Sequence, residues 1–387
     1  MWDTEQMKKK YVIGLNSGTS FDGIDVALVK FSRNLKVKLV DGFVYEYPMV
    51  VRERIRKLIN PYVGAGRDLH LLREISQLNF LLGEIFAEAA LKIIKKNKLK
   101  QENILLIASH GQTIYHHPET ESFGKYKISS TFQIGESSVI SARTSIKVIS
   151  NFREADIAAG GQGAPLMPYL DHVYFGNSKN LKAILNIGGI SNVTVVGEGI
   201  IPIAFDIGPG NALIDMISKK YFNKEFDVDG KLAKDGKVIS RFVEIALKDP
   251  YFKNKPPKST GKEYFNLRFV EKYFSKIRNK EDKIATVTYF SAKVIEKAFN
   301  DFIFPKYKVK ELVISGGGLK NIVLVNHLKE LLLNLRFSTS DKYGLPYKCK
   351  EAILFALLGY TCHLKKPNNI PSCTGAKEKI ILGKIVT

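Results

Sequence analysis

A short stretch of charged and small residues is the first candidate for chemistry in this chain. Arg153, Glu154 and Asp156 stand close together, and the run Ile157-Ala158-Ala159-Gly160-Gly161-Gln162-Gly163 follows them. Small residues beside charged ones indicate close backbone packing around an ionic centre. An aspartate before an apolar run suits a carboxylate that is partly shielded from water, as a general base needs. Asp156 is therefore the candidate base, and the alternative is a structural ion pair with Arg153.

Three glycine-rich turns, each after a strand-like run, are the candidates for phosphate binding. They are GLNSGTSFDG from Gly14, FDIGPGN from Phe205 and SGGGLKN from Ser315. Such turns offer backbone N–H groups to phosphates without a Cβ in the way. Asp22 and Asp206 lie in two of them, where a carboxylate beside a phosphate requires a divalent cation. The alternative for either aspartate is a turn cap. The sequence contains no G-x-x-x-x-G-K-[ST] loop and no complete dinucleotide-binding fingerprint.

A histidine-rich segment, SHGQTIYHHP from Ser109, leaves a predicted buried strand. The histidine spacing matches no helical metal-binding pair. We therefore expect His110, Gln112 and His116 to hydrogen-bond a polar ligand, with plain loop packing as the alternative. Glu351 opens the apolar run 352–359, where a carboxylate in a first helical turn is favoured by the helix dipole.

The elements that must position these residues form two similar halves. Strands of the first half are expected at 10–15, 24–31, 36–47 and 104–109, with a helix at 69–96. Strands of the second half are expected at 182–187, 192–196, 200–206 and 311–315, with helices at 211–221 and 285–302. This repeated order predicts an internally duplicated α/β architecture with the ligand site in the cleft between the halves. We expect domain I at 1–135 plus 370–387, to which a C-terminal strand at 379–386 returns, and domain II at 136–369.

Composition narrows the class of protein. The 387 residues are 45% hydrophobic and 25% charged, and 59 Lys and Arg against 38 Asp and Glu give a net charge of +21. The basic residues are scattered, so we expect a solvated surface and no specific nucleic-acid partner. Cys349, Cys362 and Cys373 have no C-x-x-C spacing, which fits a reducing cytoplasm. The longest apolar stretch, 352–358, is far below the roughly 18 residues that span a bilayer, so no membrane association is expected.

Together, a series of segments resembles the anhydro-N-acetylmuramic acid kinases, sugar kinases of the actin, hexokinase and heat-shock ATPase superfamily. The segments are GLNSGTSFDGIDVALV, SHGQTIYHHP, TFQIGESSVIS, NFREADIAAGGQGAPLMPYLD, LNIGGISNV, FDIGPGNALID, PPKSTGKEYFN, SGGGLKN and KEAILFALLGY. The resemblance implies a duplicated ribonuclease-H-like (actin-like ATPase) fold, with two domains flanking a nucleotide and sugar cleft. It implies that hydrolysis of the 1,6-anhydro bond of 1,6-anhydro-N-acetylmuramic acid is coupled to ATP-dependent phosphorylation at O6, giving N-acetylmuramic acid 6-phosphate and ADP. ATP and Mg²⁺ are the implied cofactors, and a homodimer is compatible with it.

The resemblance also implies roles for individual residues. Asp156 falls on the catalytic aspartate of the motif D-[IV]-A-x-G-G-Q-G-A-P-L, and would deprotonate the water that attacks the anomeric carbon. Substrate binding is expected at Gln112, His116, Arg153 and Glu351. ATP binding is expected at Asn16, Ser17, Gly18, Thr19, Ser20, Asp22, Gly23, Gly188, Gly189, Asp206, Gly208, Gly210, Asn211, Gly316, Gly317 and Gly318. Asp206 would also orient the magnesium shell through water.

Two residues depart from the pattern of this family. Asn16 stands where the family usually carries Met, and Asn151 stands where Asp is common, which leaves Arg153 with one fewer anionic neighbour. The alternative enzyme is another sugar or polyol kinase of the same superfamily, in which Asp156 deprotonates a hydroxyl. The alternative from a different class is an ATP-driven binding module, which the absence of a separate peptide-binding domain disfavours.

Overall fold

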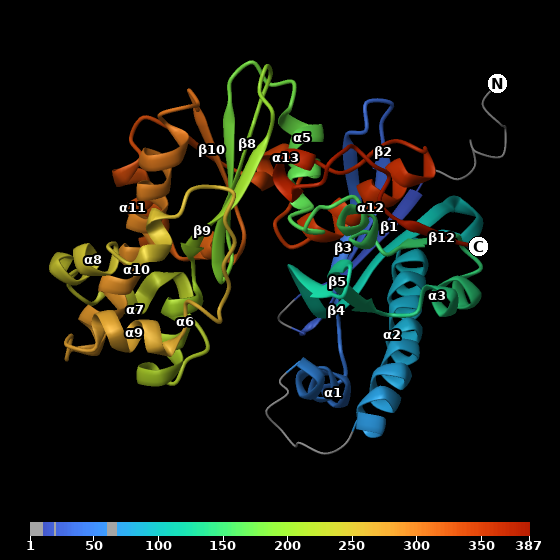
Figure 1. Ribbon diagram of the computed structural model, residues 1–387, viewed down its shortest axis with the longest axis horizontal. Helices are drawn as coiled ribbons and strands as arrows, with labels where there is room; N and C mark the ends of the chain where they lie inside the picture. Colours follow the sequence, from blue (N-terminus) through green and yellow to red (C-terminus); the bar gives the residue numbers. More distant parts are fainter. Residues whose placement is uncertain (1–10, 19–20, 60–67) are drawn as a thin grey trace. The chain divides into compact units, whose positions relative to one another are not determined.

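A computed structural model (Figure 1) describes residues 11–18, 21–59 and 68–387, without the side chains of 68–70. The chain forms two compact units: unit 1 comprises Met1–Val173 and Gly344–Thr387, and unit 2 comprises Tyr174–Tyr343. Each unit is an α/β structure with one mixed sheet.

The sheet of unit 1 has the strand order β12-β6-β4-β1-β2-β3, with β5 paired to β4. Its strands are β1 (Tyr11–Ser17), β2 (Gly23–Phe31), β3 (Val37–Glu46), β4 (Ile104–Phe123), β5 (Tyr126–Ile134), β6 (Val148–Ser150) and β12 (Lys384–Val386). Strands β1, β2 and β3 form the expected antiparallel meander, and β4 is parallel to β1. Strand β4 extends far beyond the expected 104–109, so the histidine-rich segment continues this strand and pairs with β5.

Helices cover both faces of this sheet. The helices of unit 1 are α1 (Met49–Ile59), α2 (Asp68–Lys96), η1 (Gln101–Asn103), α3 (Ser137–Thr144), α4 (Glu154–Ala158), α5 (Met167–Phe175), α12 (Lys350–His363) and α13 (Pro371–Thr374). Successive side chains of a strand point to opposite faces. Ile13 and Leu15 of β1 pack in the cluster that contains Leu82 and Phe86 of α2. Gly14 between them faces α12 instead, because a Cβ there would lie 1.9 Å from the Ala352 carbonyl oxygen.

The division into units differs from the expected domain boundaries near 135 and 370. The short strand β6 pairs in parallel with β4 and antiparallel with β12, so the chain after 135 remains in the first sheet. Helix α12 packs against β1, which brings the segment before 370 into unit 1 as well. The expected boundary near 135 falls before β6, a strand of three residues that leaves almost no periodic pattern in the sequence. Strand β12 lies within the expected C-terminal strand at 379–386 and pairs with β6 in the first sheet.

Unit 2 repeats the topology of unit 1. Its strands are β7 (Lys182–Ile187), β8 (Ile190–Val196), β9 (Ile203–Pro209), β10 (Glu311–Ser315) and β11 (Arg336–Thr339), in the order β11-β10-β7-β8-β9. Strands β7, β8 and β9 form an antiparallel meander, β10 is parallel to β7 and β11 is parallel to β10. A meander followed by two parallel strands on the side of its first strand thus occurs in both sheets. This confirms the duplicated ribonuclease-H-like, actin-like ATPase fold.

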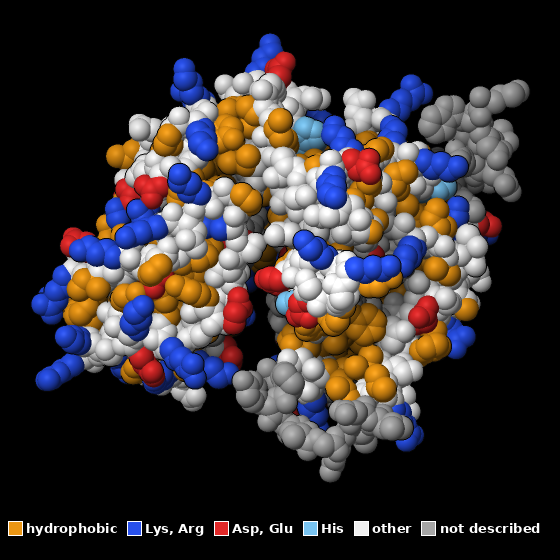
Figure 2. Space-filling view, viewed as in Figure 1, with side chains coloured by type: hydrophobic (Ala, Val, Ile, Leu, Met, Phe, Trp, Pro, Cys, Tyr) orange, Lys and Arg blue, Asp and Glu red, His pale blue; other side chains and the backbone are white. Residues whose placement is uncertain are grey.

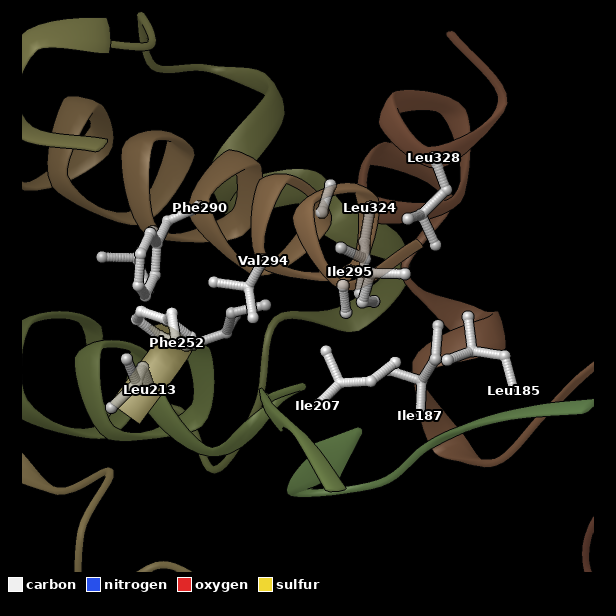
Figure 3. Packing of buried hydrophobic residues seen from close by; sticks show 14 of the residues in the cluster. Leu185, Ile187, Ile207, Leu213, Phe252, Phe290, Val294, Ile295, Leu324 and Leu328 are labelled. Atoms are coloured by element: carbon white, nitrogen blue, oxygen red, sulfur yellow. The ribbon is translucent and has the colours of Figure 1, made fainter. Parts of the chain in front are cut away.

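The core of unit 2 lies between its sheet and helix α10. The helices of unit 2 are α6 (Ala212–Phe222), η2 (Val228–Gly230), α7 (Lys231–Lys234), α8 (Ser240–Ala246), η3 (Pro250–Lys253), α9 (Leu267–Phe274), α10 (Lys280–Ala298), the π-helical η4 (Phe299–Ile303), η5 (Gly317–Lys320), α11 (Ile322–Leu331) and η6 (Ser340–Tyr343). Helix α10 begins where the Asn279 side chain accepts from Asp282 N at 2.7 Å, an N-cap. Its Phe290 and Ile295 are fully buried with Ile187 of β7 (Figure 3). Each such side chain contributes about 1.5–3 kcal/mol through burial.

A buried carboxylate joins three elements at one side of this sheet. Glu311 of β10 accepts hydrogen bonds from Lys182, Arg336, Ser338 and Tyr343. Burial acts to raise the pKa of Glu311, but these four hydrogen bonds together hold it well below its usual range. The cluster ties β10 to its parallel neighbours β7 and β11.

Among the described residues, basic side chains do not gather in one patch on the visible face of the molecule (Figure 2). On the face shown in Figure 2, Lys and Arg side chains are spread among acidic, polar and hydrophobic ones. Within the described residues, none of the helices has both the length and the apolar character needed to cross a bilayer. The three cysteines are buried and form no disulfide.

Candidate active site

Close packing of α12 on β1 places a carboxylate beside the first glycine-rich turn. The missing side chain of Gly14 lets the backbone of α12 approach at Ala352. Glu351, in the first turn of α12 as expected, then lies next to Asn16 at the end of β1. Asn16 Nδ2 donates to Glu351 Oε2 at 2.7 Å. Asn16 therefore contacts the carboxylate expected to face the sugar, and its own expected contact with ATP stays a prediction.

Gln112 braces the same turn. The Ser17 hydroxyl donates to Gln112 Oε1 at 2.6 Å and lies 3.0 Å from Gly23 O. Gln112 Nε2 donates to Thr113 O at 3.2 Å and lies 3.5 Å from Gly18 O. The Gln112 side chain is 0% exposed. The polar groups of Gln112 thus position the turn, and its expected contact with substrate stays a prediction.

Three more residues of this turn, Thr19, Ser20 and Asp22, are expected to bind ATP. Asp22 is exposed, and its carbonyl oxygen accepts from Tyr47 N at 3.1 Å, which fixes the turn at the start of β2. Thr19 and Ser20, both expected to bind ATP, lie outside the described residues.

Asp156 is held on three sides. It lies in α4, is 0% exposed, and accepts from Gly163 N at 2.9 Å through Oδ2. Its Oδ1 accepts from Thr374 Oγ1 at 2.8 Å and from Asn369 Nδ2 at 3.2 Å. A carboxylate has about four acceptor positions, so three donors leave about one for a ligand. A Cβ at Gly161 would lie 2.2 Å from Oδ2, which confirms that the small residues allow close packing around this charge.

Arg153 packs beside a neutral histidine. Its Nε donates to His110 Nε2 at 3.0 Å, and its Nη1 donates to Gly163 O at 2.8 Å. In the described part of the chain no carboxylate lies within ion-pair distance of its guanidinium, so the alternative of a direct Arg153–Asp156 ion pair is not found. Burial lowers the pKa of Arg153 to about 10, although Glu351, Glu154 and Asp156 act to raise it. The charges of these three carboxylates therefore act on one half-buried cation.

The two histidines near Arg153 are neutral at physiological pH. Burial, and next the Arg153 charge, lowers the pKa of His110 well below its usual value. The same two causes lower the pKa of His116 to about 4. His116 Nδ1 lies 3.0 Å from Thr131 Oγ1 of β5, and His110 Nδ1 lies 3.1 Å from Gly111 O. Neutral imidazoles beside a guanidinium are suited to hydrogen-bonding a polar ligand.

The departure at Asn151 has a local explanation. Asn151 has a left-handed backbone, with φ of +58°, a conformation that asparagine tolerates. Its amide donates to Glu154 and its Oδ1 accepts from Ser150 Oγ at 2.9 Å. Asn151 thus engages a carboxylate as a donor, which an ionised aspartate could not do.

In unit 2 the glycine-rich turn FDIGPGN is hydrogen-bonded to the turn between β7 and β8, which contains Gly188 and Gly189. Gly210 N donates to Gly189 O at 2.9 Å, Asn211 N to Gly188 O at 2.8 Å, and Ala212 N to Gly189 O at 3.0 Å. These hydrogen bonds fix the backbone of Gly210 and Asn211 against the turn that contains Gly188 and Gly189. The ATP contacts expected for these residues stay a prediction.

The glycine-rich turn SGGGLKN, which begins at Ser315, packs against Ile187 at the end of β7. Gly316 has φ of +91°, and a Cβ on it would lie 2.6 Å from Ile187 O. A Cβ on Gly318 would lie 2.3 Å from Ile187 Cγ2. Gly317 is exposed, and a Cβ on it would lie 3.9 Å from Asn211 Nδ2, an ordinary van der Waals distance. The Asn211 amide and Gly317 thus lie side by side.

Gly208 has a packing role. It is buried in β9, and a Cβ would lie 2.9 Å from Val294 Cγ1 and 3.0 Å from Phe252 Cε1. Both are core side chains of unit 2 (Figure 3). Gly208 is therefore in close contact with the core, and its expected contact with ATP stays a prediction.

Asp206 has the properties of a residue that interacts with a cation. Burial raises the pKa of its carboxyl to about 6, and Oδ2 accepts from Thr260 N at 3.1 Å. Lys258 acts to lower that pKa, and burial lowers the pKa of Lys258 itself to about 8. Within the described residues no group of three or more His, Cys, Asp or Glu side chains could hold a metal. Mg²⁺ usually takes one or two carboxylates and completes its shell with water and phosphate, so one buried carboxylate fits.

Comparison with known proteins assigns the chain. The anhydro-N-acetylmuramic acid kinase family profile matches residues 10–387. The chain belongs to this family. It is 44% identical to the anhydro-N-acetylmuramic acid kinase of Caldanaerobacter subterraneus subsp. tengcongensis, over 98% of this chain and 97% of that protein. It is 41% identical to the enzymes of the same name from Clostridioides difficile and Francisella tularensis subsp. novicida, over 97% of this chain and 98% of each. As a kinase of this family, the chain uses ATP.

Three residues of this kinase's candidate site are not apparent from the sequence motifs. Asn369 and Thr374 hold Asp156 from 213 and 218 positions away, and no local pattern marks them. Asp25 stands between Ile24 and Val26 in β2, a strand that is apolar apart from Asp25 and Lys30, which is a signal that this carboxylate is at least partly buried. Its carboxyl lies beside the Asn16 side chain.

Proposed function

We propose that the protein hydrolyses the 1,6-anhydro bridge of 1,6-anhydro-N-acetylmuramic acid and transfers the γ-phosphate of ATP to O6. The observation that carries this proposal is the Asp156 carboxylate, which is shielded from solvent and oriented by Gly163, Asn369 and Thr374. An oriented carboxylate with one remaining acceptor position is the equipment of a general base for water. Family membership supports the same substrate.

The proposed reaction balances with one water and one ATP. Asp156 takes a proton from the water while the water oxygen bonds to C1, and the C1–O6 bond breaks with its electron pair moving to O6. O6 then bonds to the γ-phosphorus and the bond to the β-phosphate oxygen breaks, which releases ADP. The proton on Asp156 is finally lost to solvent. The products are N-acetylmuramic acid 6-phosphate, ADP and a proton.

The neighbours of Asp156 support binding of the sugar. The transition state at C1 resembles an oxocarbenium ion and is stabilised by carboxylates. Glu351 is an accessible carboxylate in the same unit, and its charge reaches Arg153, as does that of Asp156. We propose that Glu351 accepts from a sugar hydroxyl, and that Arg153 and neutral His116 donate to the polar substituents of the sugar.

Residues for the nucleotide are proposed in each unit separately. In unit 1 we assign it to the braced turn around Ser17, Gly18 and Gly23, and in unit 2 to the Asn211 side chain and the exposed Gly317. Phosphoryl transfer depends mainly on positioning and charge neutralisation. Mg²⁺, which neutralises phosphate charge when bound, would be held through water by Asp206. The cation would offset the cost of burying this carboxylate.

The second candidate is a kinase for a different sugar or polyol, in which Asp156 deprotonates a hydroxyl. Incubation with ATP, Mg²⁺ and either the anhydro-sugar or ring-opened N-acetylmuramic acid, followed by mass spectrometry of the products, separates the two. We expect ADP and a sugar phosphate only from the anhydro-sugar. Phosphorylation of the ring-opened sugar alone would favour the second candidate.

The surroundings of the enzyme are proposed from its surface and thiols. Scattered basic residues suggest anionic small ligands and no specific nucleic-acid partner. Three buried thiols without a disulfide suit a reducing compartment such as the cytoplasm.

A further inference from the structure

Two carboxylates joined by one amide lie where β1 meets α12. Asn16 is 2% exposed and donates to Glu351. Asp25 of β2 is its cross-strand partner, so both side chains emerge on one face of the sheet, and Asn16 also hydrogen-bonds Asp25. This face is the one toward α12, because Gly14, two residues earlier on β1, meets Ala352. We call Asn16, Asp25 and Glu351 the Asn16 cluster.

Cations balance the negative charge of the Asn16 cluster only in part: Arg153 interacts with Glu351. The other titratable neighbours of Asp25 are Tyr47 and Cys349, whose pKa values are raised by burial and, in addition, by the charge of Asp25. Neither is a cation. Burial, and next the charge of Glu351, raises the pKa of Asp25 to about 7, while the Asn16 hydrogen bond acts in the opposite direction. Because two adjacent ionised carboxylates repel, the pair retains one proton near neutral pH.

We propose that Asn16 and Asp25 are positioning residues for Glu351: Asn16 fixes the orientation of the Glu351 carboxylate, and the proton on Asp25 keeps the pair at one negative charge. This proposal rests on the proposed function, which takes Glu351 as a carboxylate that faces the sugar. A singly charged pair leaves Glu351 oriented to accept from a sugar hydroxyl. When Asp25 ionises, repulsion displaces Glu351 and sugar binding weakens.

The first test follows the proton and does not depend on turnover. The ¹³C carboxyl NMR signal of Asp25, assigned by its absence in Asp25→Asn, is titrated in wild type and in Asn16→Leu, with Asn16→Ala used if leucine disturbs folding. We expect a midpoint near pH 7 in wild type. The midpoint should move to higher pH in the Asn16 variant, because the hydrogen bond that favours the ionised form is lost. Asp41→Asn, which removes a carboxylate paired with Lys96 elsewhere in unit 1, should not move it.

The second test is the pH dependence of kcat/KM for the anhydro-sugar at saturating ATP. Loss of one proton with a midpoint near pH 7 predicts roughly a tenfold fall between pH 6 and pH 8 in wild type. Asp25→Asn cannot ionise and should lose this dependence, while Asp41→Asn should retain it.

The outcomes of the two tests separate a failure of the positioning role of Asn16 and Asp25 from a failure of the proposed function. An ordinary carboxylate titration of Asp25, a midpoint unmoved by the Asn16 variants, or a wild-type pH profile in Asp25→Asn would overturn the proposal. No turnover of the anhydro-sugar, together with the expected NMR titrations, would refute the proposed function and the sugar-facing role of Glu351 while establishing the shared proton. No turnover and an ordinary titration would refute both.

Discussion

Replacing Gly161 by alanine tests whether Asp156 acts through its position. A Cβ at residue 161 would lie 2.2 Å from Asp156 Oδ2 and 2.8 Å from its Cγ, distances at which something must shift. The backbone of Gly161 does not have the positive φ of Gly160 and Gly163, so alanine adds no backbone strain there. The carboxylate must therefore move by roughly 1 Å, and a misplacement of about 1 Å costs on the order of 100-fold in rate.

The assay for Gly161→Ala is kcat with saturating ATP and anhydro-sugar, accompanied by thermal unfolding. We expect a fall of about 100-fold in kcat and a loss of about 1–3 kcal/mol in the free energy of unfolding, as for other overpacked sites. The control is a double-mutant cycle with Asp156→Asn. If the added methyl group acts by displacing the base, Gly161→Ala should have little further effect where the base is already absent.

Two results would refute the reasoning about Gly161. One is a Gly161→Ala enzyme with kcat within a few-fold of wild type, which would show that the exact placement of the carboxylate does not limit the reaction. The other is a full, additive loss in the Asp156→Asn background, which would show that alanine acts through another group.

Three further predictions concern the base and the framework. Asp156→Asn should lower kcat by roughly 100-fold to 10,000-fold while leaving the folding transition in place, because an amide cannot accept the proton; a loss of only a few-fold would make Asp156 structural. Gly14→Ala should destabilise unit 1 by at least about 1–3 kcal/mol in denaturant unfolding, because its methyl would lie 1.9 Å from the Ala352 carbonyl; unchanged stability would contradict the packing of α12 on β1. Glu311→Gln should cost about 3–5 kcal/mol by leaving Lys182 buried without its partner. The pKa of Glu311 is lower in the folded than in the unfolded protein, so the stability that its ion pair contributes is fully present above the unfolded pKa and is lost as the pH falls toward the folded pKa. A Glu311→Gln variant as stable as wild type at pH 7 would contradict this.

The fold could be predicted from the sequence because its main signals are local. Strands β1, β2 and β3 and their counterparts β7, β8 and β9 are apolar runs with turn residues between them, and the helix at 69–96 is strongly periodic. The long pairing of β4 with β5 was not predicted, since the outer part of β4 is polar and has no apolar alternation, although β5 alternates apolar and polar residues.

The candidate site could be predicted where one segment carries the chemistry and not where distant segments combine. Asp156 and the small residues around it occur together in the sequence, and their packing follows from residue size. Asn369 and Thr374 reach Asp156 only through the fold. The sequence favours substrate contact for Gln112 because polar residues after a strand often bind ligands, and nothing in its neighbourhood shows that Ser17 uses its acceptor. Residue type indicates the chemistry, while the partners depend on tertiary contacts.

Activation of water by Asp156 is tested by mass spectrometry of the product formed from ATP and 1,6-anhydro-N-acetylmuramic acid in water enriched in ¹⁸O. If Asp156 activates water for attack at C1, one heavy oxygen should appear in the C1 hydroxyl of N-acetylmuramic acid 6-phosphate, and the transferred phosphate should remain unlabelled. The label should be read before the anomeric hydroxyl exchanges with solvent, with N-acetylmuramic acid incubated in the same water as the exchange control. Label on the phosphate, or ADP formed without any sugar phosphate, would contradict hydrolysis of the anhydro bridge coupled to phosphorylation at O6.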